Sequence, residues 1–306
     1  MKRSVFIFFV AVIGVIVLVL LIGGRSDEPD DTGKLHVVAS FYPLAFFSEQ
    51  IGGNLAQVTN ITPAGAQAHD YEPTARDIAR IERARVLVLN GVGLEAWGER
   101  VRKNLEEKST VIVIAGEGLA AKTVEEEGKE IIDPHVWLAP PLAQQMVDRI
   151  ATGFAIADPA NAAAYRANAG ALTAKLAALD QRYRDGLAAC VQSSILTSHT
   201  AFGYLAAAYG FEQVALTGLS PDAEPSPQQL AALADFARER DIGYIFFETL
   251  VSPKLAQTIA REVGAQTLVL NPLEGLTDDE LAEGKDYVTE MDANLANLQL
   301  ALQCTP

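Results

Sequence analysis

Three of the four histidines in this 306-residue chain stand in polar, turn-rich segments after predicted strands. They are His69 in AGAQAHDYEPT, His135 in IIDPHVWLAP and His199 in ILTSHTAFGY. Imidazole is the commonest side-chain metal ligand in proteins. One such histidine alone is more often structural than a ligand, but three in similar contexts together indicate a metal site.

The elements around these histidines must bring them together. In open α/β sheets, ligands collect beyond the carboxyl ends of the strands. His199 directly follows the predicted strand Ser194–Thr197, and His69 follows Gln57–Ile61 after a loop. The sequence therefore places both histidines where such a fold binds ligands.

Short β-branched runs alternate with helical patterns from residue 35 onward, which predicts parallel sheets with covering helices. The first half offers the strands Leu35–Ser40, Gln57–Ile61, Val86–Asn90 and Val111–Ile114. The second half offers Ser194–Thr197, Gln213–Leu216, Tyr244–Phe247 and Thr267–Leu270. Each half thus has enough strands for an α/β lobe of its own, and we expect lobes at 35–140 and 190–306.

An Ala-rich stretch without any strand signal, 141–189, separates the two halves. Pro141 suits the start of a helix, and Asp158-Pro159 should break it, because the residue before proline is pushed out of the α region. The remainder, Ala160–Ala189, would extend about 45 Å as one helix. We expect this connecting helical region to join the lobes stiffly.

The N-terminus carries Lys2 and Arg3 followed by an apolar run, Val5–Ile22. As a helix this run would measure about 27 Å, close to the bilayer core of about 30 Å. Residues 1–24 are therefore expected to be an uncleaved anchor or a cleaved signal, and both export the chain. A polar tether, 25–34, follows, and no cysteine stands after the run for lipid attachment.

Charge and cysteine content narrow the class of protein further. The net charge of −15 disfavours nucleic-acid binding, which needs a basic face. The two cysteines, Cys190 and Cys304, are consistent with one disulfide in an exported protein. Two buried free thiols are the alternative.

Several segments together resemble the substrate-binding proteins of zinc and manganese ABC importers. They include HDYEPTARD, DPHVWL and SHTAFGYL in this order, with VVASFYPLAFF before them and LNPLEGLT after them. The resemblance covers the chain from about Leu35 to its end. It implies two α/β lobes with parallel-rich sheets flanked by helices, joined by a long rigid helix, with the metal in the cleft between the lobes.

The resemblance also implies a set of ligands, namely three histidines and one carboxylate. Position by position these fall on His69, His135, His199 and Glu274, which is the only carboxylate within 268–276. Asn271 and Glu248 stay open as alternatives for the fourth position. Three imidazoles with one carboxylate suit four-coordinate Zn²⁺, whereas manganese-type relatives resemble this chain but have a carboxylate where His199 stands.

Other residues near these positions are expected to have supporting roles. Three carboxylates could orient imidazoles or only cap loops: Asp70, Glu72 and Asp133. Trp137 and Phe202 are expected in the core or lining the cleft, and His36 is expected to be an ordinary strand residue. The acidic loop 122–130 is expected to be solvated, and the segment 116–132 lacks the histidines found in many zinc-binding relatives.

The function implied is extracytoplasmic capture of Zn²⁺ and its delivery to a membrane permease driven by an ATPase. A manganese-binding homologue and a surface adhesin on the same scaffold are the alternatives. A zinc hydrolase is disfavoured, because the sequence has no HExxH motif and no nucleophile elbow. Four protein ligands would also close the metal's coordination sphere, so we expect no enzymatic activity.

Overall fold

The computed structural model describes residues 33–126, 128–221 and 225–305. All features below belong to one compact unit, Leu35–Pro306. The predicted anchor or signal, 1–24, and nearly all of the tether, 25–34, lie outside the described residues. Among the residues that are described, no helix combines the length and apolar character needed to cross a membrane.

The first lobe is built on a four-stranded, wholly parallel sheet in the order β2-β1-β3-β4. Its strands are β1 (Leu35–Ala39), β2 (Ala56–Asn60), β3 (Val86–Leu89) and β4 (Val111–Ile114). All four residues of β3 are buried, as expected for a central strand that is covered on both faces. The predicted strands of this half are therefore confirmed.

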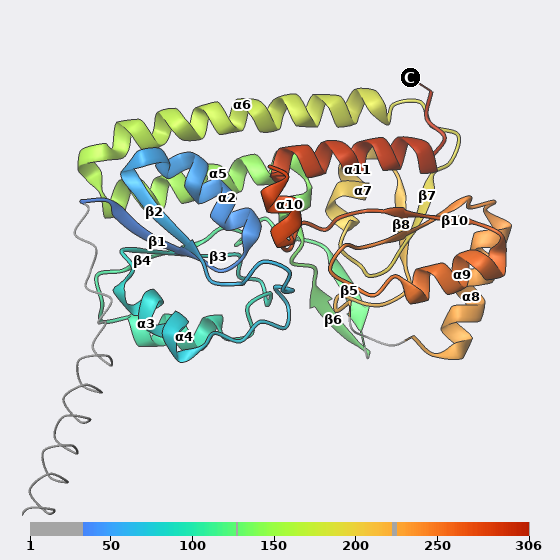
Figure 1. The fold of residues 1–306 in the computed structure, drawn as a ribbon, viewed down its shortest axis with the longest axis horizontal. Coiled ribbons are helices and arrows are strands. Elements are labelled where there is room, and N and C mark those ends of the chain that lie inside the picture. Colours follow the sequence, from blue (N-terminus) through green and yellow to red (C-terminus); the bar gives the residue numbers. More distant parts are fainter. Residues whose placement is uncertain (1–32, 127, 222–224, 306) are drawn as a thin grey trace, which may run out of the picture. The chain divides into compact units, whose positions relative to one another are not determined.

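The second lobe repeats this arrangement with the parallel order β10-β9-β7-β8. Its strands are β7 (Ser194–Thr197), β8 (Glu212–Ala215), β9 (Tyr244–Phe247) and β10 (Gln266–Val269). Helices flank both sheets (Figure 1). Those of the first lobe are α2 (Tyr42–Gly52), α3 (Ala75–Arg83) and α4 (Gly98–Leu105). Those of the second lobe are α7 (Gly203–Tyr209), α8 (Pro227–Glu239), α9 (Lys254–Val263), α10 (Asp278–Ala282) and α11 (Tyr287–Ala301).

Two antiparallel helices form the connecting region, α5 (Pro140–Ala157) and α6 (Ala162–Gly186). The predicted break lies between them, where the Asp158 carboxylate accepts hydrogen bonds from Asn161 and Tyr165. Helix α6 extends along both lobes and packs against its neighbour α5, against α2 of the first lobe and against α11 of the second lobe (Figure 1). Arg182 on α6 forms a two-point ion pair with Asp292 on α11, at 2.8 and 2.9 Å.

One hydrophobic core runs through both lobes and the connecting helices. Aromatic side chains join α2 of the first lobe to α11 of the second, since Tyr287 packs against Phe46 and Phe47 with ring centroids 5.8 and 4.9 Å apart. Phe41 packs edge-on against Trp137 at 4.8 Å. The two lobes are therefore held together by direct apolar packing as well as by the long helix α6.

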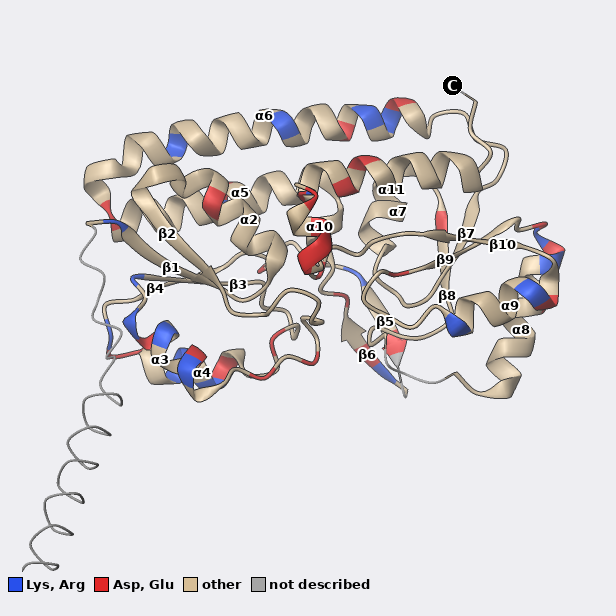
Figure 2. Ribbon diagram, viewed as in Figure 1, with Lys and Arg blue, Asp and Glu red and all other residues tan. Residues whose placement is uncertain are grey.

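Two elements differ from the sequence-based expectations. The acidic segment expected as a solvated loop is largely exposed, as expected, but it forms an antiparallel hairpin, β5 (Thr123–Glu126) and β6 (Lys129–Ile132). Gly128 adopts a left-handed φ of 74° in its turn, which permits the tight reversal. Helix α10 has no counterpart among the predicted elements; Thr277 caps it, and its first turn holds three acidic residues (Figure 2).

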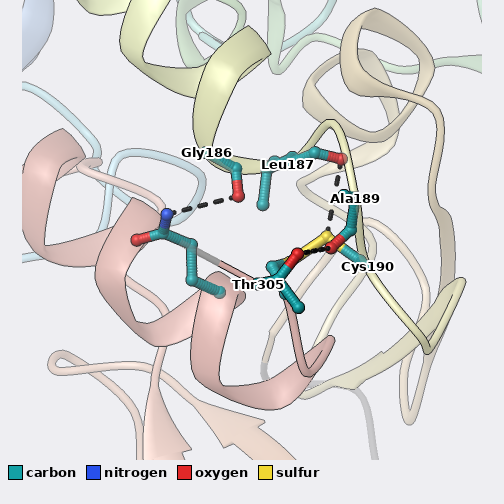
Figure 3. Close-up of a disulfide and its surroundings, with 7 residues drawn as sticks. Gly186, Leu187, Ala189, Cys190 and Thr305 are labelled. Atoms are coloured by element: carbon teal, nitrogen blue, oxygen red, sulfur yellow. Dashed lines mark hydrogen bonds between the residues drawn. A yellow bond between two sulfur atoms is a disulfide. The ribbon is translucent and has the colours of Figure 1, made fainter.

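The predicted disulfide between Cys190 and Cys304 is present. It joins the segment after α6 to the end of the chain, across a sequence separation of 114 residues (Figure 3). Beside it, the amide of Thr305 donates to the Ala189 carbonyl, and Nε2 of Gln299 donates to the Gly186 carbonyl. The bridge thus fastens the C-terminus to the end of the connecting helix.

Candidate metal centre

Four side chains from four separate segments converge on one point between the lobes. His69 comes from the loop between β2 and α3, and His135 lies between β6 and the short 3₁₀ turn Val136–Leu138. His199 follows β7, and Glu274 lies in the loop after β10. One ligand atom from each residue lies within 4.8 Å of the others. The structure thus brings together all four residues predicted as metal ligands.

The spacing of these atoms can be compared with a coordination polyhedron. Nε2 of His135 lies 3.1 Å from Nε2 of His69 and 3.4 Å from Nε2 of His199. Oε1 of Glu274 lies 3.4, 3.6 and 3.5 Å from the nitrogens of His69, His135 and His199. Four ligands about 2.0–2.1 Å from a central Zn²⁺ in a tetrahedron lie about 3.3 Å from one another. Five of the six separations thus fit a tetrahedral zinc site, and the sixth, between His69 and His199, is at most 4.8 Å.

Solvent reaches the four side chains unequally. The side chains of His135 and His199 are completely buried, and that of Glu274 is 3% exposed. His69 is the most accessible, with 14% of its side chain exposed. Oε1 of Glu274 is buried and has no hydrogen-bond partner among the described residues. A buried carboxylate oxygen without a partner is costly, and a bound cation would supply the missing interaction.

Two of the imidazoles are oriented by buried carboxylates on their far sides. Nδ1 of His135 lies 2.7 Å from Oδ1 of Asp133, and Nδ1 of His199 lies 2.5 Å from Oε1 of Glu248. With Nδ1–H donating to the carboxylate, Nε2 keeps its lone pair for a metal. Carboxylate–histidine pairs of this kind fix the tautomer and the ring orientation of metal-binding histidines.

Electrostatics inside the cluster favour the charged forms of Glu274, His199 and His135. Burial opposes ionisation of Glu274, but the imidazoles of His135, His199 and His69, whose nitrogens lie 3.4–3.6 Å from its Oε1, hold its pKa well below the usual value. Burial disfavours protonated His199, but the Glu248 and Glu274 carboxylates raise its pKa to about 10. The pKa of His135 is raised in the same way by Asp133 and Glu274, against the effect of burial. Without metal, the cluster therefore binds protons that a cation would displace.

The alternatives for the fourth ligand lie elsewhere in the structure. Glu248 is bound to Nδ1 of His199 rather than to the central point. The Asn271 side chain accepts a hydrogen bond from the Leu273 amide and donates one to Glu290. Glu274 is thus the carboxylate that joins the three histidines.

The other predicted residues have mixed outcomes. Asp133 orients an imidazole as expected, whereas Glu72 pairs with Arg100 at 2.9 Å. Asp70 is exposed beside His69, and His36 pairs with Gln57 in the first sheet. Trp137 and Phe202 are fully buried, as expected.

Sequence reasoning missed the hydrogen bonds by which two residues, Trp137 and Tyr204, connect the lobes beside the site. Nε1 of Trp137 donates to the Pro272 carbonyl at 2.8 Å, which connects the segment of His135 to that of Glu274. The Tyr204 hydroxyl accepts from the amides of Ala121 and Lys122 and donates to the Asp133 carbonyl. The position of Trp137 two residues after His135 is the one available signal, and it cannot identify a partner so distant in sequence.

Comparison with known proteins identifies similar chains. Residues 37–301 match the family model for ZnuA, described as the periplasmic component A of a zinc-uptake complex. A Bacillus subtilis protein named high-affinity zinc uptake system protein ZnuA is 40% identical over 290 residues, 91% of this chain and 90% of the relative.

A second relative is the zinc-binding lipoprotein AdcA of Streptococcus pneumoniae. It is 39% identical over 285 residues, but this chain spans only 57% of its length while 90% of this chain is matched. The crystal structure of its Zn(II)-bound ZnuA-like domain superposes with a TM-score of 0.78 at 37% identity, over 88% of this chain and 99% of that domain.

A third similar protein is the laminin-binding protein Lmb of Streptococcus agalactiae. Its structure is described as that of a bifunctional protein with adhesin and metal-transporting activity. It superposes with a TM-score of 0.79 at 33% identity, over 88% of this chain and 99% of the other. All three similar proteins are thus described in terms of zinc or of metal transport.

Proposed function

This chain belongs to the ZnuA family of zinc-uptake complex components, and on that premise we propose that it captures Zn²⁺ outside the cytoplasm and delivers it to an ABC permease driven by an ATPase. Zinc is the cargo, and His69, His135, His199 and Glu274 are its ligands. Because these ligands come from both lobes, the metal orders the cleft when it binds. Release requires the transporter to move ligands apart.

The observation that carries this proposal is the convergence of three imidazole nitrogens and one carboxylate oxygen, with five of their six separations between 3.1 and 3.6 Å. Three nitrogen donors favour zinc over manganese, which prefers oxygen ligands. The buried carboxylates behind His135 and His199 add the support typical of a zinc site. We therefore propose zinc rather than manganese as the transported ion.

Competition titration of the purified full chain in detergent tests the proposal. The expected result is one tightly bound Zn²⁺ per chain, with Mn²⁺ unable to displace it. Since supporting residues alone alter affinity roughly 10- to 100-fold, His199→Ala should weaken zinc binding more than about 100-fold. The matched control is His36→Ala, which removes the histidine outside the cluster and should leave the affinity unchanged. Zinc binding by His199→Ala as tight as by the natural chain would refute the site.

The same geometry argues against a hydrolytic role. A catalytic zinc keeps a coordination position open for water or substrate. Here four protein ligand atoms surround one point within 4.8 Å of one another, so zinc bound by all four has a filled tetrahedral shell. We propose that the protein is not an enzyme.

The placement of the protein follows from the same proposal. Residues 1–24 would anchor the chain in the cytoplasmic membrane or direct its export, and 25–34 would form a tether. The lobe at 35–140, the connecting region at 141–189 and the lobe at 190–306 would then face the extracytoplasmic space. We propose that the permease binds this exported part, residues 35–306, to receive the zinc ion.

Adhesion is a second candidate, favoured by the similarity to a laminin-binding protein described as bifunctional. Binding of immobilised laminin by the zinc-loaded full chain tests it. Saturable binding that His199→Ala abolishes would indicate metal-dependent adhesion, and binding that survives this change would indicate a separate surface. If laminin does not bind, adhesion is excluded and transport remains the proposed function.

A further inference from the structure

Glu274 differs from the buried histidines in how its side chain is oriented. The rings of His135 and His199 are each held from behind by a carboxylate. Oε1 of Glu274 faces the three imidazoles and has no hydrogen-bond partner among the described residues. The course of the main chain that carries Glu274 therefore contributes to the direction of this carboxylate.

That main chain takes a strained course directly before Glu274. Leu273 has a left-handed φ of 55°, a conformation that a branched residue seldom adopts, and its side chain is completely buried. Such a conformation persists only where the surrounding structure fixes it. The contacts that fix the turn 271–273 therefore determine where Glu274 points.

Helix α11 supplies the most direct of these contacts. Oδ1 of Asn294 accepts a hydrogen bond from the Asn271 amide at 2.8 Å, and Nδ2 of Asn294 donates to the Asn271 carbonyl at 2.7 Å. Both asparagines are buried, at 2% and 1% exposure. A single side chain thus binds both main-chain groups of the residue that begins the turn.

The Asn271 side chain makes two further hydrogen bonds that fix the turn. Its Oδ1 accepts from the Leu273 amide at 2.8 Å, and its Nδ2 donates to Oε2 of Glu290 at 3.2 Å. Glu290 lies on α11 one helical turn before Asn294. Buried polar networks in which every hydrogen bond is made specify a single conformation. Helix α11 therefore fixes the turn through two residues, Asn294 and Glu290.

We propose that Asn294, assisted by Glu290, is a positioning residue for zinc binding, acting by fixing the turn that aims Glu274 at the metal. This inference rests on the proposed function, because it requires Glu274 to be a zinc ligand. It assigns to α11 a part in metal binding although none of the four proposed ligands lies on this helix.

Asn294→Ala tests the proposal in the full chain, with Asn297→Ala as the matched control. Nδ2 of Asn297 also donates from α11 to a main-chain carbonyl, that of Val269 at 2.8 Å, but this bond lies on β10 before the turn. Asn294→Ala should weaken Zn²⁺ binding roughly 10- to 100-fold, the range typical of residues that support metal ligands. It should also alter the visible spectrum of bound Co²⁺, which reports ligand geometry. Asn297→Ala should change neither.

The variant Glu274→Ala separates this proposal from the proposed function. If Asn294 acts through Glu274, then Asn294→Ala weakens zinc binding in the natural chain but not in the Glu274→Ala background. Equal weakening in both backgrounds, or no weakening in either, would overturn the positioning role. Unchanged zinc affinity of Glu274→Ala itself would instead overturn the ligand assignment.

A second pair of variants keeps the question decidable if Asn294→Ala fails to fold. Glu290→Ala removes the acceptor for Nδ2 of Asn271, whereas Glu290→Gln keeps an oxygen at the same place. We expect weaker zinc binding and a changed Co²⁺ spectrum for Glu290→Ala, with recovery in Glu290→Gln. Identical zinc affinities for the two variants would count against the proposal.

Discussion

Buried negative charge accumulates around the imidazole cluster. Glu274 contributes one carboxylate to the centre, and Asp133 and Glu248 contribute two more immediately behind the rings. Since buried charges must be paired, the three carboxylates supply enough negative charge within the site to compensate a divalent cation. The same three carboxylates raise the pKa values of His135 and His199 in the metal-free protein, against the effect of burial.

Zinc affinity should therefore fall as the pH falls. The pKa of His199 is raised to about 10 in the metal-free protein, so this ring is protonated at neutral pH and zinc must displace its proton. Each displaced proton weakens apparent binding about tenfold per pH unit below the pKa of its group. Calorimetric titrations between about pH 6 and about pH 8, in buffers of different ionisation enthalpy, measure both the affinity and the proton release. Affinity independent of pH over this range, without proton release, would contradict the assignment.

The residues of the site differ in how far the sequence predicts them. The three histidines and Glu274 are predictable because residue type and flanking motifs identify them. Asp133 is predictable because it lies two residues from His135. Asn294 is not, because nothing local connects it to a loop 23 residues away. Its place among the apolar residues on the buried side of α11 is the only local sign of a polar partner.

Among the elements, α5 packs unusually closely on the first sheet. A Cβ atom at Gly153 would lie 2.2 Å from Cγ2 of Val113 on β4, so the helix approaches the strand at a distance that only glycine permits. Gly170 on α6 faces open space, because a Cβ atom added there would meet nothing within 4 Å. Two helical glycines thus have opposite structural surroundings.

Alanine substitutions at these two glycines should have opposite effects on stability. Gly170→Ala should stabilise the protein by up to about 1 kcal/mol through helix propensity. Gly153→Ala should destabilise it by about 1–3 kcal/mol, because the added methyl overpacks the contact with Val113. Urea unfolding of the metal-free chain measures both, and Val113→Ala should restore part of the loss in the Gly153→Ala background. Stabilisation by Gly153→Ala would show that α5 can move away from β4.

The one segment expected as a loop that forms strands is the acidic segment 122–130, in which charged residues outnumber the residue types typical of strands. The hairpin β5–β6 places Glu125 directly opposite Glu130, a pairing that disfavours strands. Its β-branched residues lie at the outer ends, where Thr123 pairs with Ile132 and Val124 with Ile131. The base of the hairpin is fastened by Tyr204 of the second lobe, a contact between distant segments. Tertiary bonding thus stabilises strands that the local sequence disfavours.

For the whole molecule, the disulfide closes most of the second half of the chain into one loop. Replacing both Cys190 and Cys304 by Ser should lower the free energy of unfolding by about 4–5 kcal/mol, the chain-entropy value for a loop of this length. The zinc affinity should stay unchanged, because none of the proposed ligands lies in the short segments next to Cys190 and Cys304. Denaturant unfolding and zinc titration measure the two effects, and the natural chain in reductant should match the double variant. Loss of zinc binding would reveal a link between the chain end and the site.

The core shared by the two lobes limits how the metal can leave. Swinging the lobes apart would expose Phe46, Phe47, Tyr287 and Trp137 to water. At about 1.5–3 kcal/mol for each large apolar side chain, this would require roughly 6–12 kcal/mol, comparable to the entire stability of an ordinary domain. If zinc release required the lobes to separate, the free energy needed would be comparable to the free energy of unfolding of the protein. Displacing one ligand segment would leave that core intact, so under the proposed function we expect zinc to be released by a local movement while the two lobes stay packed together.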